Sequence, residues 1–285
     1  MQIGFAGLGA MGAPLARTLL RAGKQMLVWN RSPEKAEALV RAGAGGTQAA
    51  CLADFAACGV VFTCLALPEH VRTVAAGAAG LYAAMRPGSV HVECSTIAPD
   101  TARELAEAAA AKGIAYVQCT LGKTPAHAER GEAPLFIGGP AAVVEPLKDL
   151  FACMGAPNYV GSVEAACAVK LISNLVGMTN LAVLAEGLKL GDKAGLDRQT
   201  LLALLADTGA RSFQMDVRGP WLAEEDFAPR FGLDLALKDV RLGCAMAAGW
   251  GMEPALMRGA LELFTQASAG GHGKEDCAAV ITAMR

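Results

Sequence analysis

The chain has 285 residues, a formal net charge of −2 and 53% hydrophobic residues. This length is near the limit for one hydrophobic core, so we expect two domains. The near-neutral charge, without long charged runs, argues against a nucleic-acid partner or an anionic membrane surface. The nine cysteines form no CxxC pair and no Cys/His cluster. This pattern is typical of reduced thiols in a cytoplasmic protein and predicts no metal site.

A glycine motif opens the chain. A short strand expected over 2–6 runs directly into Gly7-Leu8-Gly9-Ala10-Met11-Gly12, and a helix is expected over 13–22. Strand, GxGxxG turn and helix in this order are the context of the dinucleotide-binding fingerprint. Gly7 would make the tight turn, Gly9 would let the backbone approach a pyrophosphate, and Gly12 would let the helix pack closely on the strand. The N–H groups at the helix N-terminus would bind the phosphates.

The loop after the second expected strand (25–29) bears on the choice of cofactor. It reads Asn30-Arg31-Ser32, whereas NAD-preferring sites usually place an acidic residue here to hold the ribose 2′-hydroxyl. Arg31 is positive and Ser32 can donate a hydrogen bond, which suits a 2′-phosphate. We therefore expect NADP(H) as the preferred cofactor and NAD(H) as the second choice. The alternative is an ordinary surface loop before the helix expected over 33–42.

Strands and helices alternate through the first half of the chain. Further strands are expected over 60–65, 89–94 and 114–117, with helices after Pro68 and over 100–112. The alternation predicts an α/β fold with an N-terminal Rossmann-type, doubly wound parallel sheet. Ligands of such sheets bind at the carboxyl ends of the strands. The segments at these ends are Leu65-Ala66-Leu67, Ser95-Thr96 and residues 120–125.

One long helix is expected over 164–194, where proline is absent and Gly195 follows as a stop. Its apolar residues go all the way round, so it should be buried between domains or between subunits, and we expect a homodimer or homotetramer. Lys170, Ser173, Asn174 and Gly177 form a polar stripe on one face. Burying a lysine costs free energy unless its ammonium group has partners or a function. The alternative is that Lys170 reaches the surface and Asn174 satisfies a neighbour.

We expect a dinucleotide-binding domain over 1–163 and an all-helical substrate and dimerisation domain over 164–285. The second domain should contain helices over 198–207, with Asp197 as N-cap, and over 233–248, 252–267 and 274–284, with an irregular stretch over 209–229. A membrane span is not expected, because Lys170, Asn174, Asn180 and Glu186 interrupt the apolar runs of the long helix.

These motifs, in this order, resemble the β-hydroxyacid dehydrogenases, a family that includes 3-hydroxyisobutyrate dehydrogenase and tartronate semialdehyde reductase. The resemblance covers essentially the whole chain. The glycine motif is similar to the family's N-terminal signature, and Cys94-Ser95-Thr96 to its cofactor and substrate loop. Lys170 with Asn174 resembles its catalytic lysine and asparagine. Residues 231–239, FGLDLALKD, resemble its C-terminal segment, in which the position of Lys238 touches the cofactor and that of Asp239 lies near the active site.

One loop departs from the family pattern. The family usually has D-A-P-V-S-G-G where residues 118–124 read QCTLGKT, so Gly122 replaces the serine and Lys123-Thr124 replace the glycines. This variant is similar to sulfolactaldehyde reductase, a family member whose loop reads G-R-T. A cation and a hydroxyl could bind a sulfonate, or a substrate with extra negative charge. The alternative is that Lys123 points to solvent and backbone N–H groups hold an ordinary carboxylate.

The resemblance implies an oxidoreductase acting on CH–OH groups, which transfers hydride between a nicotinamide and a small acid-bearing aldehyde or β-hydroxyacid. Lys170 would be the general acid–base, with Asn174 orienting it or the substrate. The residues expected at the cofactor are Gly7, Leu8, Gly9, Ala10, Met11, Gly12, Asn30, Arg31, Ser32, Leu65, Ala66, Leu67, Thr96 and Lys238. Those expected at the substrate are Ser95, Thr96, Leu121, Gly122, Lys123, Thr124, Lys170, Asn174, Phe231 and Asp239.

Two alternatives remain at this point. An imine reductase-like NADPH enzyme has the same architecture, but such enzymes commonly lack a lysine at the Lys170 position. A non-catalytic dinucleotide-binding protein would bind the cofactor without turnover, and the intact pair of Lys170 and Asn174 argues against it.

Overall fold

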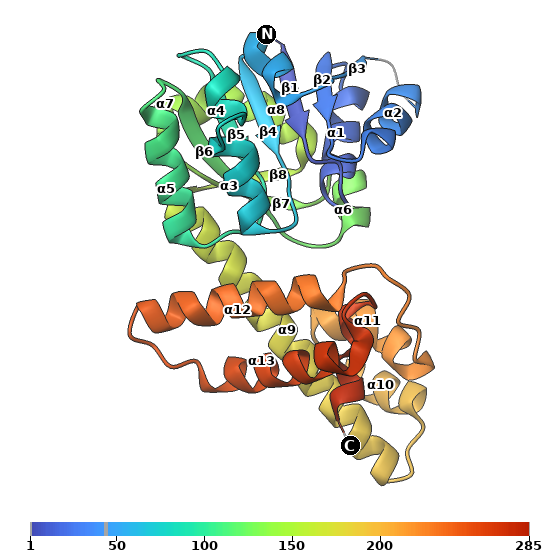
Figure 1. Cartoon of the computed structure of the whole chain (residues 1–285). Coiled ribbons are helices and arrows are strands. Elements are labelled where there is room, and N and C mark those ends of the chain that lie inside the picture. Colours follow the sequence, from blue (N-terminus) through green and yellow to red (C-terminus); the bar gives the residue numbers. More distant parts are fainter. Residues whose placement is uncertain (1, 43–44, 285) are drawn as a thin grey trace. The chain divides into compact units, whose positions relative to one another are not determined.

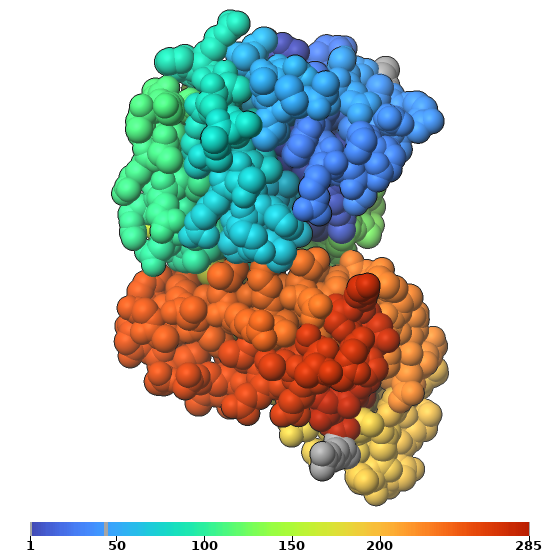
Figure 2. All heavy atoms as spheres, viewed as in Figure 1, coloured from blue at the N-terminus to red at the C-terminus, as the bar shows by residue number. Residues whose placement is uncertain are grey.

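The computed structural model describes residues 2–42 and 45–284. The chain forms two compact units, Met1–Lys170 and Leu171–Arg285 (Figure 1). The division falls inside helix α9 (Val163–Lys193), whose start lies at the domain boundary expected from the sequence. Figure 2 shows one face of the chain with all heavy atoms, coloured along the sequence as in Figure 1.

One eight-stranded sheet, in the order β3-β2-β1-β4-β5-β6-β7-β8, forms the centre of the first unit. The strands are β1 (Ile3–Ala6), β2 (Met26–Trp29), β3 (Gly46–Gln48), β4 (Val60–Thr63), β5 (Val90–Glu93), β6 (Ala115–Leu121), β7 (Pro134–Gly138) and β8 (Ala156–Gly161). The pairs from β3 to β6 are parallel, which confirms the Rossmann-type fold. Strand β7 runs antiparallel to β6, and β8 runs parallel to β7. The sequence did not anticipate this antiparallel pair, because neither β7 nor β8 was recognised as a strand.

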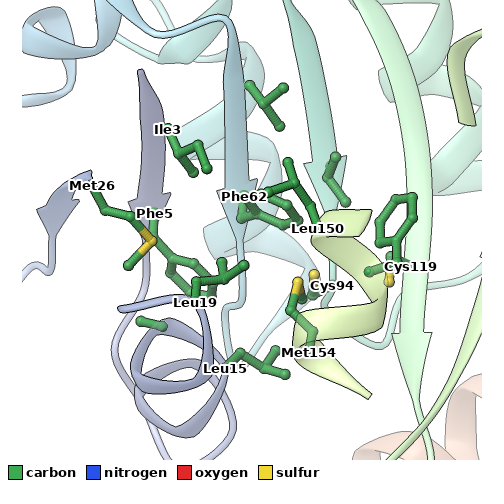
Figure 3. Packing of buried hydrophobic residues seen from close by; sticks show 14 of the residues in the cluster. Ile3, Phe5, Leu15, Leu19, Met26, Phe62, Cys94, Cys119, Leu150 and Met154 are labelled. Atoms are coloured by element: carbon green, nitrogen blue, oxygen red, sulfur yellow. The ribbon is translucent and has the colours of Figure 1, made fainter. Parts of the chain in front are cut away.

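Helices cover both faces of the sheet, which is why its strands read as continuous apolar runs. On one face α1 (Gly12–Arg21) and α8 (Lys148–Met154) pack over Phe5 and Phe62 (Figure 3), and α2 (Pro33–Ala42) packs beside them over β2 and β3. On the other face η1 (Leu52–Ala57), α3 (Pro68–Ala76), α4 (Leu81–Ala84) and α5 (Pro99–Ala110) pack over Val61. Short helices α6 (Pro125–Glu129), α7 (Ala141–Val144) and η2 (Glu145–Leu147) complete the unit.

The second unit is helical, as expected. Beyond α9 it contains α10 (Arg198–Ala206), α11 (Phe213–Glu224), α12 (Leu233–Gly249), α13 (Ala255–Ala267), η3 (Ser268–His272) and η4 (Cys277–Ala283). Within 171–284 the structure has no strand and a single isolated bridge, between Gly232 and Asp276. The prediction that Asp197 caps α10 is confirmed, since its Oδ2 accepts the Thr200 N–H at 2.8 Å.

Two expectations for this unit were wrong. The stretch 209–229 is not irregular throughout, because α11 occupies Phe213–Glu224. Pro220 lies inside this helix and made the sequence look broken, but the Ser212 cap and the buried face containing Met215 and Leu222 stabilise the helix. The segment expected as a helix over 274–284 forms only the 3₁₀ helix η4.

Helix α9 has one face buried and another exposed. Its buried residues Leu175, Leu181, Leu184 and Leu188 belong to the core of the second unit, whereas Val183 and Leu190 are exposed. Among the described residues, α9 is the one helix long and apolar enough, by length and composition, to cross a membrane. The most apolar window has a mean hydropathy of 1.5, and 39% of it is buried. The core helix of a soluble protein can pass the same test of length and composition, although such a helix is mostly buried.

Candidate active site

The glycine motif forms the turn between β1 and α1. Gly7 has φ 98°, and a Cβ there would lie 2.4 Å from the carbonyl oxygen of Cys64. A Cβ on Gly12 would lie 1.9 Å from the carbonyl oxygen of Gly7, so neither position accepts a side chain. A Cβ on Gly9 would meet no atom within 4 Å, and no side chain caps the N-terminus of α1 at Met11. The open side of the turn and the uncapped helix therefore fit the pyrophosphate of a dinucleotide.

Asn30 joins this turn to the loop that follows β2. Its side chain accepts the Leu8 N–H at 2.9 Å and donates to the carbonyl of Ser32 at 3.0 Å. Strands β1 and β2 are parallel neighbours, so both loops leave the same edge of the sheet. Arg31 is exposed within this loop. The structure thus brings together two of the segments expected at the cofactor.

The loops after β4 and β5 are also side by side. The N–H of Leu65 donates to the hydroxyl oxygen of Ser95 at 2.7 Å. Ala66 is exposed, Thr96 is partly buried, and Leu67 is the N-cap residue of α3. A Cβ on Gly7 would lie 2.7 Å from Cδ2 of Leu65, which places this loop against the glycine turn.

A buried polar cluster lies at the ends of β4 and β5, and none of its residues was expected at the site from the sequence. The Thr63 hydroxyl lies 2.7 Å from His91 Nε2 and 2.6 Å from Glu93 Oε2, and the Tyr82 hydroxyl lies 2.8 Å from His91 Nδ1. Burial lowers the pKa of His91 to about 3. Burial raises the pKa of Glu93 to about 7, although hydrogen bonds from Ser95 and Thr63 oppose that rise. Polar residues within otherwise apolar strands were the available signal.

The loop that departs from the family pattern has an unusual backbone. Lys123 has φ 62°, a left-handed conformation that favours glycine. A Cβ on Gly122 would lie 2.7 Å from Cγ of Pro134, so the serine usual in the family would require Pro134 to move. Lys123 is exposed, with its ammonium 3.5 Å from the carbonyl oxygen of Glu132. The Thr124 hydroxyl lies 2.8 Å from Nδ1 of His127.

Ion pairs hold the helix after this loop, α6, against α1. The Glu129 carboxylate accepts hydrogen bonds from Arg17 at 2.6 to 3.0 Å and from Arg21 at 2.7 Å. Single exposed ion pairs contribute little stability, but this carboxylate is bound by two guanidinium groups, one of them bidentate. The contact fixes the position of the 122–124 loop relative to the dinucleotide-binding helix.

Lys170 lies on α9 where that helix leaves the first unit. The buried hydroxyl of Thr120, on β6, donates to the carbonyl of Ala166 at 3.0 Å. Ala166 is one helical turn before Lys170, so this bond anchors the part of α9 that carries the lysine. Lys170 itself is partly buried, and Leu121 is buried beside Thr120 on the same strand.

In the second unit, two motifs that are far apart in the sequence meet. Asn174 Nδ2 donates to Asp239 Oδ2 at 2.5 Å, joining α9 to α12. Lys238 Nζ lies 2.8 Å from the other carboxylate oxygen, and Asp239 is 4% exposed. The backbone of Phe231 is also fixed: its N–H donates to Oδ2 of Asp276 at 2.9 Å. Asp276 also forms a buried ion pair with Arg218, which no motif in the sequence indicates.

Among the described residues, 2–42 and 45–284, no group of His, Cys, Asp or Glu side chains has the arrangement of a metal site.

Two family profiles match the chain from end to end. Residues 2–170 match the NAD binding domain of 6-phosphogluconate dehydrogenase, and residues 165–284 match the NAD-binding domain of NADP-dependent 3-hydroxyisobutyrate dehydrogenase. The chain belongs to the β-hydroxyacid dehydrogenase family. It is therefore a nicotinamide-dinucleotide-dependent oxidoreductase acting on CH–OH groups.

Relatives of this dehydrogenase span its full length. It is 35% identical to 2-(hydroxymethyl)glutarate dehydrogenase of Eubacterium barkeri, over 99% of this chain and 94% of that protein. It is 31% identical to L-threonate dehydrogenase of Cupriavidus necator, over 98% of this chain and 95% of that protein. The solved structure of 3-hydroxyisobutyrate dehydrogenase from Salmonella typhimurium superposes with a TM-score of 0.90, at 28% identity and 99% coverage of both chains.

Two further similarities concern other kinds of protein, a nuclear factor and an imine reductase. The dehydrogenase is 30% identical to the cytokine-like nuclear factor N-PAC of Xenopus tropicalis, over 99% of this chain but only 53% of that longer protein. An imine reductase from Pseudomonas sp. superposes over 100% of this chain and 99% of its own, with a TM-score of 0.64 at 22% identity. The imine reductase therefore has the same fold, and the similarity shows nothing beyond that.

Proposed function

We propose that this dehydrogenase uses NADP(H) to interconvert a small β-hydroxyacid and its acid-bearing aldehyde, with Lys170 as the general acid–base. The observation that best supports this proposal is that Lys170 lies one turn before Asn174, whose amide is held by the buried carboxylate of Asp239. In this arrangement, the ammonium of Lys170 and the fixed amide of Asn174 would act on the same substrate oxygen. When bound, the dinucleotide supplies the hydride acceptor or donor.

The residues of the chain would bind the cofactor and move one proton. The turn from Gly7 to Gly12 and the N-terminus of α1 would hold the pyrophosphate, and the 65–67 and 95–96 loops would border the nicotinamide half. In oxidation, Lys170 would accept the proton of the substrate hydroxyl, and in reduction it would return the proton to the carbonyl oxygen. Asn174 would orient the substrate or the lysine, and Lys238 would contact the cofactor.

The preference for NADP(H) rests on the loop after β2. Arg31 is exposed there, Ser32 follows it, and the loop contains no acidic residue that would repel a 2′-phosphate. Asn30 keeps this loop against the pyrophosphate turn through its bond to Leu8. These observations support binding of the 2′-phosphate close to Arg31.

For the substrate, we propose a compound with more negative charge than a single carboxylate. Gly122, Lys123 and Thr124 would bind its acid groups together with Thr96 and Phe231, and the buried Ser95 and Leu121 would support the site from behind. Lys123 supplies a cation at a position where the family usually has glycine, and the Eubacterium barkeri relative is named for a dicarboxylate. A second carboxylate or a sulfonate would suit this cation equally well by charge.

The test is a panel of hydroxyacids oxidised with NADP⁺ and with NAD⁺. It should include 2-(hydroxymethyl)glutarate, L-threonate, 3-hydroxyisobutyrate and a sulfonate-bearing hydroxy compound. We expect turnover with NADP⁺ and the highest kcat/KM on a dianionic or sulfonated substrate. Turnover of cyclic imines with NADPH, without any hydroxyacid activity, would favour the imine reductase alternative. Cofactor binding without turnover of any of these compounds would favour the non-catalytic one.

A further inference from the structure

Glu93 ends β5 and is completely buried. One carboxylate oxygen, Oε1, accepts the backbone N–H of Ser95 at 2.6 Å. The other, Oε2, accepts the hydroxyl of Thr63 at the end of β4, also at 2.6 Å. Burying a carboxylate is costly unless its oxygens are bound by hydrogen-bond donors, and both oxygens of this one are.

Ser95 connects this carboxylate to two loops. Its hydroxyl oxygen accepts the N–H of Leu65 at 2.7 Å, and its carbonyl accepts Nε2 of Gln118 at 3.1 Å. Ser95 is only 3% exposed. The first residues after β4 and after β5 are therefore held to one another through Ser95, and Ser95 is held by Glu93.

If Glu93 is replaced, the other side chains of the cluster can exchange hydrogen-bond partners among themselves, but the Ser95 N–H loses its partner. When Glu93 is ionised, Thr63 donates to it and accepts from Nε2 of the neutral His91, while Tyr82 donates to Nδ1. Without the carboxylate, Thr63 could donate to Nε2 instead, with Nδ1–H donating to Tyr82. The Ser95 N–H would then have lost its acceptor, which is costly for a buried donor.

The sheet order indicates which half of the dinucleotide these loops border. Strand β2 lies on one side of β1, whereas β4 and β5 lie on the other. The loop with Arg31 follows β2 and the pyrophosphate turn follows β1. The nicotinamide half of a dinucleotide bound at this switch in strand order therefore extends over the loops that follow β4 and β5.

We propose that Glu93 is a positioning residue for the nicotinamide half of the cofactor: it fixes the Ser95 backbone and, through Ser95, the Leu65 loop. This inference rests on the proposed binding of NADP(H). It assigns Glu93 no contact with the substrate or the cofactor. Glu93 would therefore affect the affinity for the nicotinamide half of the dinucleotide, while the other half binds elsewhere on the same sheet.

The test compares two ligands by calorimetry: NADPH, and adenosine 2′,5′-bisphosphate, which lacks the nicotinamide half. Glu93→Met replaces the carboxylate by an apolar side chain of similar length. We expect it to weaken NADPH binding about tenfold, as for the loss of a charge-assisted hydrogen bond. Binding of the bisphosphate should stay within about twofold, because its contacts are distant from Ser95. Glu93→Gln should restore most of the NADPH affinity, since its amide oxygen can accept the Ser95 N–H.

Tyr82→Phe is the matched control, because it removes a buried hydroxyl from the same cluster and leaves the bond between Glu93 and Ser95 intact. Its affinity for NADPH should remain within about twofold of the wild type. Equal weakening of both ligands in Glu93→Met, or unchanged NADPH binding, would overturn the inference. If Glu93→Met does not fold, Ser95→Ala tests the link to Leu65: selective loss of NADPH affinity supports the inference, and wild-type affinity overturns it. A wild-type protein that binds neither ligand would instead overturn the proposed function.

Discussion

The side-chain amide of Asn174 donates to the carboxylate of Asp239 at 2.5 Å, and this bond joins two motifs that are 65 residues apart in the sequence. Asn174 comes from the middle of α9 and Asp239 from the first half of α12. The ammonium of Lys238 lies against the same carboxylate. The amide proposed to act beside Lys170 is therefore held in one orientation by a buried charge.

The first prediction follows from this pair. Asn174→Ala and Asp239→Ala should each lower kcat/KM for the hydroxyacid, because each removes either the amide or the group that orients it. The double variant should be little worse than the worse single variant, with a coupling of about 0.5–3 kcal/mol, as found for residues in contact. Steady-state kinetics measure this coupling, and the control is Asn180→Ala, which alters an exposed amide on the same helix. Strictly additive effects would show that Asp239 does not act through Asn174.

The second prediction concerns Lys170. Lys170→Ala should lower kcat by about 10² to 10⁴, the range typical of a general acid–base, while NADPH binding measured by fluorescence changes little. Lys193→Ala removes another lysine of α9, at its exposed C-terminal end, and should keep the wild-type kcat. A Lys170→Ala enzyme with near-wild-type kcat would exclude this lysine from the proton transfer.

The third prediction concerns the cofactor. The wild type should have a higher kcat/KM with NADPH than with NADH, and Arg31→Ala should remove most of that difference, because a charge-assisted contact to the 2′-phosphate contributes about 1.5–3 kcal/mol. Arg41→Ala is the matched control, since Arg41 is another exposed arginine, on α2, and pairs with Glu37. Equal kcat/KM with the two cofactors in the wild type would contradict the proposed preference.

The fourth prediction separates two properties of Lys123, its charge and its backbone. Lys123→Gly and Lys123→Ala should both raise KM for acid-bearing substrates about ten- to a hundredfold, because both remove the cation. Only Lys123→Gly should also stabilise the protein, by about 1 kcal/mol, because glycine adopts φ 62° without strain. Kinetics and urea denaturation measure the two effects, and Lys123→Arg should keep KM near the wild-type value. An unchanged KM in both neutral variants would make Lys123 a solvent residue.

The fifth prediction concerns assembly. Ile172, Val176, Val183 and Leu190 form a stripe along one face of α9, and their exposed fractions run from 46% to 68%. Such a stripe is typical of a surface that another chain covers, and symmetric dimers are the commonest assembly. We therefore expect at least a homodimer in sedimentation at micromolar concentration. Val183→Glu should weaken the dimer, whereas Leu256→Glu, on the exposed face of α13, should not. A strictly monomeric wild type would contradict this expectation.

The sequence predicted the elements whose signals are local. The glycine turn, the long helix and the Asp197 cap each depend on a short run of residues, and the structure has all three. It could not predict β7 and β8 or the buried pair of Arg218 and Asp276, because these depend on contacts between residues that are distant in the chain. The cluster around Glu93 also depends on such contacts, since its members come from three separate elements, and only the polar residues within its apolar strands indicated it.

The unit boundary falls between Lys170 and Leu171, within an unbroken helix, and Asn174 lies only one turn beyond it. The two units are therefore not interchangeable modules in evolution or in protein engineering. A chimaera joined at this boundary would take the lysine from one parent and the asparagine from the other. It would also have to preserve the helical phase between them, because one inserted or deleted residue rotates the second part of the helix by about 100°. Successful exchanges between relatives should therefore have junctions before α9, so that the whole helix comes from one parent.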